Sequence, residues 1–415
     1  MNKENTSNSS DFDLVIWGAS GFTGRLVAEY LLGQYGVGGE LRWAMAGRNQ
    51  AKLETVRDGL GQGSEAVPIL LADSHDPDSL EALVNQTRVI CSTVGPFAKY
   101  GSELVAACVR TGTHYCDITG ETQWIRRMID AHEDQARASG ARIVNCCGFD
   151  SIPSDLGCLF INQSMQTRHG TPCDEVKMRV RRMRGAFSGG TFASMLNAVE
   201  EARRDPQARK ALGNPYGLNP RGETSGPDGS DQSSVKWDAD VDSWTAPFVM
   251  AAINTRVVRR SNAVMDYAYG RDFRYSEAVM TGRGAAGWAR AMSVTAALGG
   301  FLLATSVSAT RALVNKLLPD PGEGPSAEDR ERGFFDIVMV GKAGDRTLRA
   351  RVKADRDPGY GATCKMLGES AVCLALDESE LTVTGGFWTP AAAMGAILIA
   401  RLENNAGMSF TIEAD

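Results

Sequence analysis

A glycine-rich stretch near the N-terminus has the residue types and spacing of a phosphate-binding loop. It reads Gly18-Ala-Ser-Gly-Phe-Thr-Gly24, after an apolar run that ends at Trp17 and before a helical pattern. In such loops the first glycine permits a tight turn, the second lets backbone approach a pyrophosphate, and the third lets helix and strand pack closely. The alternative is a purely structural glycine turn. We expect nucleotide contacts from Gly18, Ser20, Gly21, Phe22, Thr23 and Gly24.

The end of the second predicted strand bears on the choice of nucleotide. An NAD site places Asp or Glu there to hold the ribose 2′-hydroxyl, but this strand ends Ala46-Gly47-Arg48. Arginine suits a 2′-phosphate through its charge and paired donors. Arg48 therefore favours NADP(H), the alternative being a solvated arginine at a helix start. Asp73, after the third predicted strand, suits either a contact with adenine or a turn.

Polar and glycine-rich segments follow the later predicted strands. Ligands of open α/β sheets bind at the carboxyl ends of the strands, so we expect the nicotinamide ribose beside Gly95, Pro96 and Phe97. The candidate catalytic residues, chosen as donors to developing charge, are Tyr100, Thr119 and Ser151. Helix starts and caps are the plain alternatives for several of these positions. Substrate contacts are predicted for Asp117, Glu121, Asp150, Gly189, Gly190 and Thr191.

The sequence lacks the residues that several other classes of enzyme and binding protein require. No tyrosine has lysine four positions later, which excludes the short-chain dehydrogenase arrangement. The four histidines do not cluster with cysteine, and the nine cysteines show no CxxC, so we expect no metal site and reduced thiols. The net charge is -6 with scattered basic residues, which argues against a nucleic-acid partner. Catalysis would therefore rest on hydride chemistry of the cofactor.

The elements that must position these residues alternate between strand and helix from residue 12 to 155. Apolar strands are expected at 13–18, 41–46, 66–72, 89–94, 113–116 and 141–145, with helices between them. This alternation, with short connections, predicts an α/β fold with a Rossmann-type, doubly wound parallel sheet. Residues 1–11 are polar and lack the pattern of a signal peptide, so we expect a disordered tail.

The pattern changes after residue 155 and predicts a second, smaller α+β substrate and dimerisation domain over 156–356. Residues 176–183 alternate like an antiparallel strand, and 333–340 with 346–354 form a hairpin pattern. A helix is expected at 191–204. Residues 206–242 are rich in Gly, Pro, Asn, Asp and Ser and predict a long loop or mobile segment. We expect helices at 361–376 and 389–406.

At these residues the sequence resembles the saccharopine dehydrogenase-like superfamily, and within it the trans-acting enoyl reductases. The resemblance rests on the Gly18 loop, Ala46–Arg48 and Val94–Phe97, and further on the segments 116–121, 148–155, 188–191, 357–360 and 389–390. It implies a Rossmann domain interrupted by a substrate domain, with helices of 357–415 returning to the first domain. It also implies NADP(H) and, in that branch, reduction of an enoyl double bond.

Three functions stay open at this point. The first is NADPH-dependent reduction of the C=C bond of an enoyl thioester or a related lipid or polyketide intermediate. The second is a saccharopine-type, imine-forming amino-acid dehydrogenase, which arginines converging on the nicotinamide would favour; an apolar tunnel would favour the first. The third is a non-catalytic NADP(H)-binding protein at a lipid surface. The substrate would be a small molecule or an acyl chain.

An uncharged apolar segment lies at 291–309, between Arg290 and Arg311. Its many small and hydroxyl side chains make membrane spanning marginal. It suits a buried helix, a dimer contact or a lipid-facing helix, and we expect one of these rather than a span. We expect a cytoplasmic homo-oligomer, with peripheral membrane contact through 291–309 as the alternative.

Overall fold

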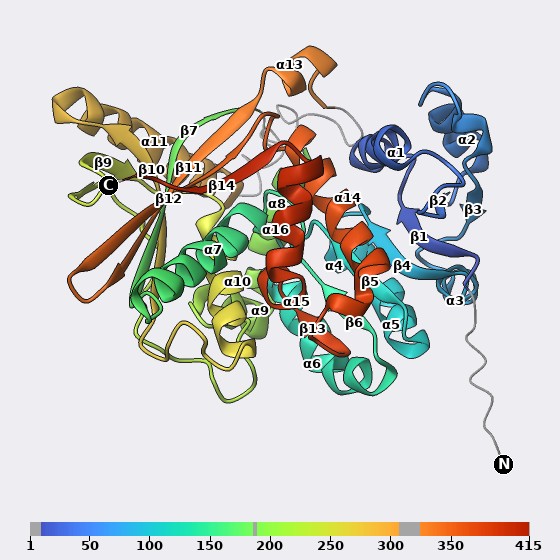
Figure 1. The fold of residues 1–415 in the computed structure, drawn as a ribbon, viewed down its shortest axis with the longest axis horizontal. Helices are drawn as coiled ribbons and strands as arrows, with labels where there is room; N and C mark the ends of the chain where they lie inside the picture. Colours follow the sequence, from blue (N-terminus) through green and yellow to red (C-terminus); the bar gives the residue numbers. More distant parts are fainter. Residues whose placement is uncertain (1–9, 186–188, 307–323, 415) are drawn as a thin grey trace.

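Two seven-stranded sheets organise the chain in the computed structural model, which describes residues 10–185, 189–306 and 324–414 (Figure 1). The first, sheet A, has the strand order β13-β6-β5-β4-β1-β2-β3, and each pair of neighbours is parallel. This confirms the predicted α/β class with a Rossmann-type parallel sheet. Its strands are β1 (Phe12–Trp17), β2 (Trp43–Gly47), β3 (Ile69–Leu71), β4 (Thr87–Ser92), β5 (His114–Asp117), β6 (Arg142–Val144) and β13 (Gly386–Trp388).

The central strands of sheet A are buried on both faces. In β1, five consecutive residues from Asp13 to Trp17 are buried, as expected for a parallel strand covered by helices on each side. The main helices of this region are α1 (Phe22–Tyr35), α2 (Gln50–Asp58), α3 (Pro77–Val84), α5 (Ser102–Thr111) and α6 (Thr122–Ser139), with a short α4 (Phe97–Tyr100) after β4. The chain crosses from β3 to β4 on the other side of β1. The strand order therefore reverses between β1 and β4, where ligands of this fold class bind.

The second sheet, sheet B, has the order β14-β12-β11-β7-β10-β9-β8. The predicted hairpin is confirmed, since β11 and β12 pair antiparallel from Phe335 with Ala354 to Ala343 with Arg346. Strand β7 is antiparallel to β11 as expected, but parallel to β10. The remaining strands are β7 (Glu175–Arg184), β8 (Lys236–Asp238), β9 (Ser243–Ala246), β10 (Arg274–Gly282), β11 (Phe334–Ala343), β12 (Arg346–Ala354) and β14 (Met408–Ile412).

Helices connect and cover the two sheets (Figure 1). Helix α7 packs on β11 and β12, and α14 packs on α1, β1 and β4. The predicted helix at 389–406 is divided at Met394. The bounds are α7 (Ile152–His169), α8 (Gly189–Arg204), α10 (Ala251–Val264), α11 (Gly284–Ser306), α13 (Ala327–Glu331), α14 (Gly361–Leu376), α15 (Pro390–Ala393) and α16 (Gly395–Asn405).

The C-terminal segment contributes a strand to each sheet, whereas only helices were expected there. Strand β13 extends sheet A beside β6, and β14 extends sheet B beside β12. Both strands are short, with three and five residues, and such short apolar runs resemble helix segments in sequence. The segment therefore joins the two sheets rather than only returning to the first.

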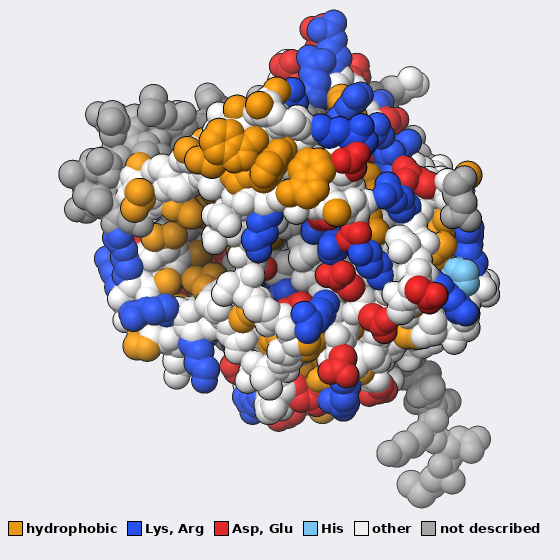
Figure 2. Space-filling view, turned by 90° about the vertical axis from the view of Figure 1, so that its left-hand side faces the viewer, with side chains coloured by type: hydrophobic (Ala, Val, Ile, Leu, Met, Phe, Trp, Pro, Cys, Tyr) orange, Lys and Arg blue, Asp and Glu red, His pale blue; other side chains and the backbone are white. Residues whose placement is uncertain are grey.

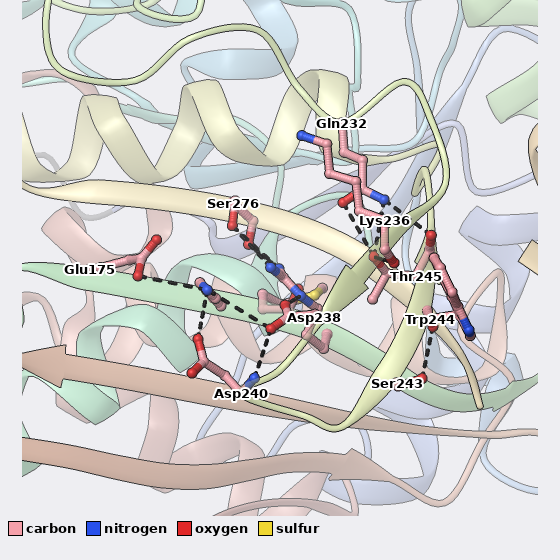
Figure 3. Close-up of polar contacts among 12 residues, drawn as sticks. Glu175, Gln232, Lys236, Asp238, Asp240, Ser243, Trp244, Thr245 and Ser276 are labelled. Carbon is pink, nitrogen blue, oxygen red and sulfur yellow. Dashed lines mark hydrogen bonds and ion pairs between the residues drawn. The ribbon is translucent and has the colours of Figure 1, made fainter. Parts of the chain in front are cut away.

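The segment 206–242 is more ordered than a long loop. It begins with α9 (Pro206–Gly213), whose N-terminus is capped by Asp205. The later part is tied to β7 by ion pairs of Asp238 with Arg179 at 2.7 Å and of Asp240 with Lys177 at 2.6 Å. Figure 3 shows Asp238 and Asp240 turned toward that strand. The Asp-Pro pair at 205–206 is a signal for the start of a helix. The prediction of a loop rested on amino-acid composition and did not use this signal.

The apolar segment expected at 291–309 forms most of α11, and residues 307–309 lie outside the described part of the chain. Within α11, Leu303 is 73% exposed and Met292 43% exposed, so the single chain does not bury these two side chains, and the dimer contact and the lipid-facing helix stay predictions. Figure 2 looks onto the end of the molecule that carries α11 and shows hydrophobic side chains gathered in its upper part. No helix among the described residues is long and apolar enough to span a membrane.

Candidate functional site

The glycine-rich loop makes the tight approach that its sequence predicts. Gly18 has a φ of 87°, and a Cβ there would lie 2.4 Å from Cγ2 of Val94. A Cβ on Gly24 would lie only 2.3 Å from the carbonyl oxygen of Gly18. The first position therefore needs glycine for its backbone conformation, and the third needs it because α1 starts against the end of β1.

The N-terminus of α1 is open toward a ligand. Its N-cap residue is Gly21, no side chain caps the helix, and its first turn holds no acidic residue. The first backbone N–H groups of a helix have no partner within the helix, and the helix dipole adds positive charge at this end. This arrangement suits a pyrophosphate, as in other dinucleotide folds.

Arg48 and Asp73 lie at the ends of β2 and β3 and both line the cavity described below. Within the described residues, the Arg48 guanidinium has no hydrogen bond or ion pair, so it is available for an anionic ligand. Asp73 accepts a 2.9 Å hydrogen bond from the backbone N–H of His75. It thus forms the turn that was one of its two predicted roles, while also bordering the cavity.

The loop after β4 is held by a buried carboxylate. Glu121 accepts hydrogen bonds from the backbone N–H groups of Phe97 at 2.7 Å and Ala98 at 3.0 Å. Burial raises the pKa of Glu121, and the bond from Ser194 and these two N–H groups act against that rise. The loop Gly95–Phe97 therefore lies in a fixed position at the carboxyl edge of sheet A.

One cavity of about 590 Å³ joins these parts. At one end lie the Gly18 loop, Arg48, Asp73 and the Gly95–Phe97 loop. The other walls come from the loops after β5, β6 and β9, from β7, and from α8, α9 and α10. They are mostly apolar, formed by Ile118, Phe149, Met183, Ala193, Met195, Ala198, Leu212, Val249, Met250, Ala252 and Ile253. Among the described lining residues, Arg48 is the only arginine or lysine.

The cavity collects all of the predicted cofactor residues, namely Gly18, Ser20, Gly21, Phe22, Thr23, Gly24, Arg48, Asp73, Gly95, Pro96 and Phe97. It also collects Tyr100, Asp150, Gly189 and Gly190. The ring of Tyr100 lies 5.8 Å from that of His75, which follows β3, so Tyr100 is on the nucleotide side. Thr191 lies in α8, and its side chain is outside the described structure.

Four predicted site residues do not line the cavity. Thr119 is fully buried and its hydroxyl accepts from the backbone N–H of Glu121. Ser151 is fully buried and donates to Asn254 at 3.1 Å. Asp117 is bound to Tyr115 and Asn145 behind the strand ends, and Glu121 to the β4 loop. These hydrogen bonds give all four a structural position, which corrects the expectation that they face the ligand.

Asp150 is the predicted substrate residue whose environment is most unusual. It is 9% exposed, lines the cavity and accepts one 3.3 Å hydrogen bond from the backbone N–H of Gly148. Burial raises its pKa to about 8, and the nearby Asp117 acts in the same direction. No lysine or arginine pairs with it within the described residues. The carboxyl group therefore keeps its proton to a higher pH than an exposed aspartic acid, as a proton donor must.

Other lining residues were missed because the sequence gives no local signal for them. Tyr360 accepts a hydrogen bond from the backbone N–H of Gly189 and packs its ring 4.7 Å from that of Phe22. It thereby connects α14, the nucleotide loop and α8. The segment 357–360 had been noted only as part of a resemblance. The apolar walls from α10 look like ordinary core positions in sequence, since nothing in a helical pattern tells a cavity wall from a packed core.

Comparison with known proteins agrees with this architecture. Residues 14–144 match the family described as the saccharopine dehydrogenase NADP binding domain. A protein of Mycobacterium tuberculosis is 42% identical over 96% of both chains. A trans-acting enoyl reductase of Mycobacterium bovis is 39% identical over 94% of this chain and 96% of its own, and one of Mycobacterium ulcerans is 38% identical over 96% and 97%.

A solved structure of distant sequence shares the fold. Apo saccharopine dehydrogenase (L-Glu forming) from Saccharomyces cerevisiae superposes with a TM-score of 0.52 at 12% identity, covering 97% of this chain and 99% of its own. At that identity the likeness concerns the fold alone. The chain belongs to the saccharopine dehydrogenase-like family of NADP-binding proteins, in the branch of the trans-acting enoyl reductases.

Proposed function

We propose that this protein reduces the C=C bond of an enoyl thioester of a lipid or polyketide intermediate, with NADPH as the reductant. The observation that carries the proposal is the shape of the cavity, which joins a nucleotide loop to a chamber with apolar walls. An acyl chain next to such walls is removed from water without unpaired charges. The name of the relatives at 38–39% identity supports the same reaction.

The amino-acid dehydrogenase alternative lacks support in the lining of the cavity. An amino-dicarboxylate substrate needs cationic partners, because a buried, unpaired carboxylate is strongly disfavoured. The one arginine among the described lining residues, Arg48, lies at the nucleotide end, where a 2′-phosphate would use it. The apolar chamber also argues against a protein that only holds NADP(H), since such a role needs no second compartment.

Asp150 is the proton donor in this proposal. A general acid must be protonated at the working pH and must reach the reacting atom. Asp150 meets the first condition through its raised pKa of about 8 and lies in the wall of the cavity. It lies in the loop between β6 and α7, and it lines the same cavity as the β4 loop. A substrate between them would have the cofactor on one side and Asp150 on the other.

The reaction then needs one hydride and one proton. Bound NADPH would supply the hydride to the β carbon of the thioester. The π electrons of the double bond move toward the thioester carbonyl, and the α carbon takes the proton of Asp150. The resulting Asp150 carboxylate regains a proton from water. The sum is one enoyl thioester, one NADPH and one proton converted to a saturated thioester and NADP⁺.

A substrate panel tests the proposal. NADPH consumption is followed with a short and a long enoyl thioester, a β-ketoacyl thioester, and a glutamate and aldehyde pair that forms an imine. We expect consumption with the enoyl thioesters, faster with the longer chain, and none with the other two. Consumption with the imine-forming pair alone would establish the amino-acid dehydrogenase instead, and tight NADPH binding without any consumption would establish the non-catalytic protein.

A further inference from the structure

An apolar groove of about 540 Å³ lies on the surface beside the cavity, between α8 and α9. Its floor is formed by Met195, Ala198, Val199 and Ala202 of α8 with Leu212 of α9. Two arginines complete the lining, Arg203 near the end of α8 and Arg209 on α9. The groove therefore combines an apolar floor with a cationic end.

The groove adjoins the cavity directly. Met195, Ala198 and Leu212 line both, so the wall of one is also the wall of the other. Arg203 is eight residues beyond Met195 on the same helix, which corresponds to about 12 Å along its axis. An extended arm whose thioester end lies beside Met195 would thus reach Arg203 after about two helical turns.

The two arginines of the groove have no carboxylate partner in the described part of the chain. Arg209 donates from Nε to the carbonyl oxygen of Ala202 at 2.9 Å, which holds its guanidinium beside the last turn of α8. Neither Arg203 nor Arg209 forms an ion pair within the described residues. The nearby carboxylates have other partners, since Glu201 pairs with Arg127, and Asp205 caps α9. Two guanidinium groups that line one groove match a phosphate in charge and in donor type.

We propose that this groove binds the phosphopantetheine arm that carries the acyl thioester, with Arg203 and Arg209 on its phosphate. The inference rests on the proposed function and names the carrier of its substrate. The acyl part and the thioester would occupy the cavity, the amide-containing arm would lie along the apolar floor, and the phosphate would meet the arginines. The same arm occurs in coenzyme A and on acyl carrier proteins, so both sources present this chemistry.

Three thioesters of the same enoyl group test the contribution of each part of the groove to binding. The N-acetylcysteamine thioester carries the start of the arm, the pantetheine thioester carries the arm without phosphate, and the phosphopantetheine thioester carries both. Two variants act on different parts: Arg203→Ala/Arg209→Ala removes the charges, and Ala202→Trp fills the floor at a position that lines only the groove. Arg204→Ala is the matched control, because Arg204 lies in the same turn but pairs with Glu200.

The variants should give different patterns of KM at unchanged kcat. In the double arginine variant, KM should rise about tenfold for the phosphopantetheine thioester and stay the same for the other two, the size expected for lost charged hydrogen bonds. Ala202→Trp should raise KM for both longer thioesters but not for the N-acetylcysteamine thioester. Arg204→Ala should change none. An equal change for all three thioesters in either variant, or no change in both, would overturn the assignment.

Two further measurements distinguish coenzyme A from a carrier protein as the source of the arm, and failure of the groove assignment from failure of the proposed function. Coenzyme A and carrier-protein thioesters should lose affinity alike in the double variant; a loss confined to the carrier protein would mean that the arginines bind its surface, and the proposal would fall. Calorimetry with phosphopantetheine should show binding to the wild type that the double variant loses, whether or not turnover occurs. If the wild type reduces the thioesters but the arginine variants have unchanged KM values, the groove assignment is wrong and the proposed function stands. If phosphopantetheine binds but no thioester is reduced, the proposed function is wrong and the groove assignment stands.

Discussion

Ser194 donates a 2.8 Å hydrogen bond to Glu121, and this contact ties α8 to the loop at the end of β4. Glu121 also accepts from the backbone N–H groups of Phe97 and Ala98. One buried carboxylate therefore fixes the cofactor edge of sheet A and the helix that forms the wall of the substrate chamber. The sequence predicted Glu121 as a substrate contact, but its carboxylate instead accepts these three hydrogen bonds within the protein.

Replacing Glu121 by glutamine tests this positioning role. An amide offers one acceptor oxygen where the carboxylate offers two, so its NH₂ group would face a backbone N–H or the Ser194 hydroxyl. We expect kcat/KM for the enoyl thioester to fall by tenfold or more and unfolding to cost about 1–3 kcal/mol less. Ser194→Ala, which removes only the link to α8, should raise KM for the thioester and leave NADPH affinity unchanged. Full activity in Glu121→Gln would show that the contact serves stability alone.

Arg48 should decide between NADPH and NADH. The guanidinium lines the cavity at the end of β2, where NAD-specific relatives of this fold class carry an acidic residue. We expect Arg48→Ala to lower NADPH affinity about tenfold and to leave the weaker NADH affinity unchanged, because only NADPH has the 2′-phosphate. Fluorescence titration of both nucleotides measures this. Equal losses for the two nucleotides would place Arg48 elsewhere on the cofactor.

Two glycines of α1 form a matched pair for testing the nucleotide loop. Gly24→Ala would place a methyl group 2.3 Å from the Gly18 carbonyl oxygen, whereas Gly33 has open space at the same point. We expect Gly24→Ala to destabilise the protein by about 1–3 kcal/mol and to abolish NADPH binding. Gly33→Ala should instead stabilise the helix by roughly 0.5–1 kcal/mol. Denaturant unfolding and NADPH titration of both variants give the comparison, and NADPH binding retained by Gly24→Ala would contradict the loop assignment.

The pH dependence of the rate should report Asp150. As a proton donor with a pKa of about 8, it is active when protonated, so kcat/KM should be constant below that pH and fall as pH rises through it. Asp150→Asn keeps the size of the side chain but has no acidic proton. We expect it to lower kcat by about 100-fold or more and to remove the basic limb. A basic limb that persists in Asp150→Asn would belong to another group.

The sequence predicted more of the nucleotide-binding residues than of the substrate-binding residues. Gly18, Gly21 and Gly24 have a spacing that one fold element requires, and Arg48 replaces an acidic residue expected at one place. Such local signals follow from backbone sterics and charge, and the cavity contains each of these residues. The alternation of strands and helices up to residue 145 likewise predicted six of the seven strands of sheet A, since buried parallel strands are continuous apolar runs.

The substrate half depends on contacts between distant segments, which no local pattern encodes. Thr119 and Ser151 are polar residues near strand ends, but their hydrogen bonds to the Glu121 backbone and to Asn254 turn them away from the cavity. Asp150, one residue from Ser151, faces the cavity. Strands β13 and β14 join sheets formed more than 50 residues earlier, and their short apolar runs had suggested no strand. Which neighbour faces a ligand is decided by tertiary packing.

The measurement that tests the central claim most directly is the fate of deuterium from NADPH labelled at the transferable C4 position. With an enoyl thioester as substrate, the account predicts a saturated product with one deuterium at the β carbon and one hydrogen from solvent at the α carbon, as read by mass spectrometry and NMR. Deuterium at the α carbon, or a labelled NADPH that is never consumed while the thioester stays unsaturated, would contradict it.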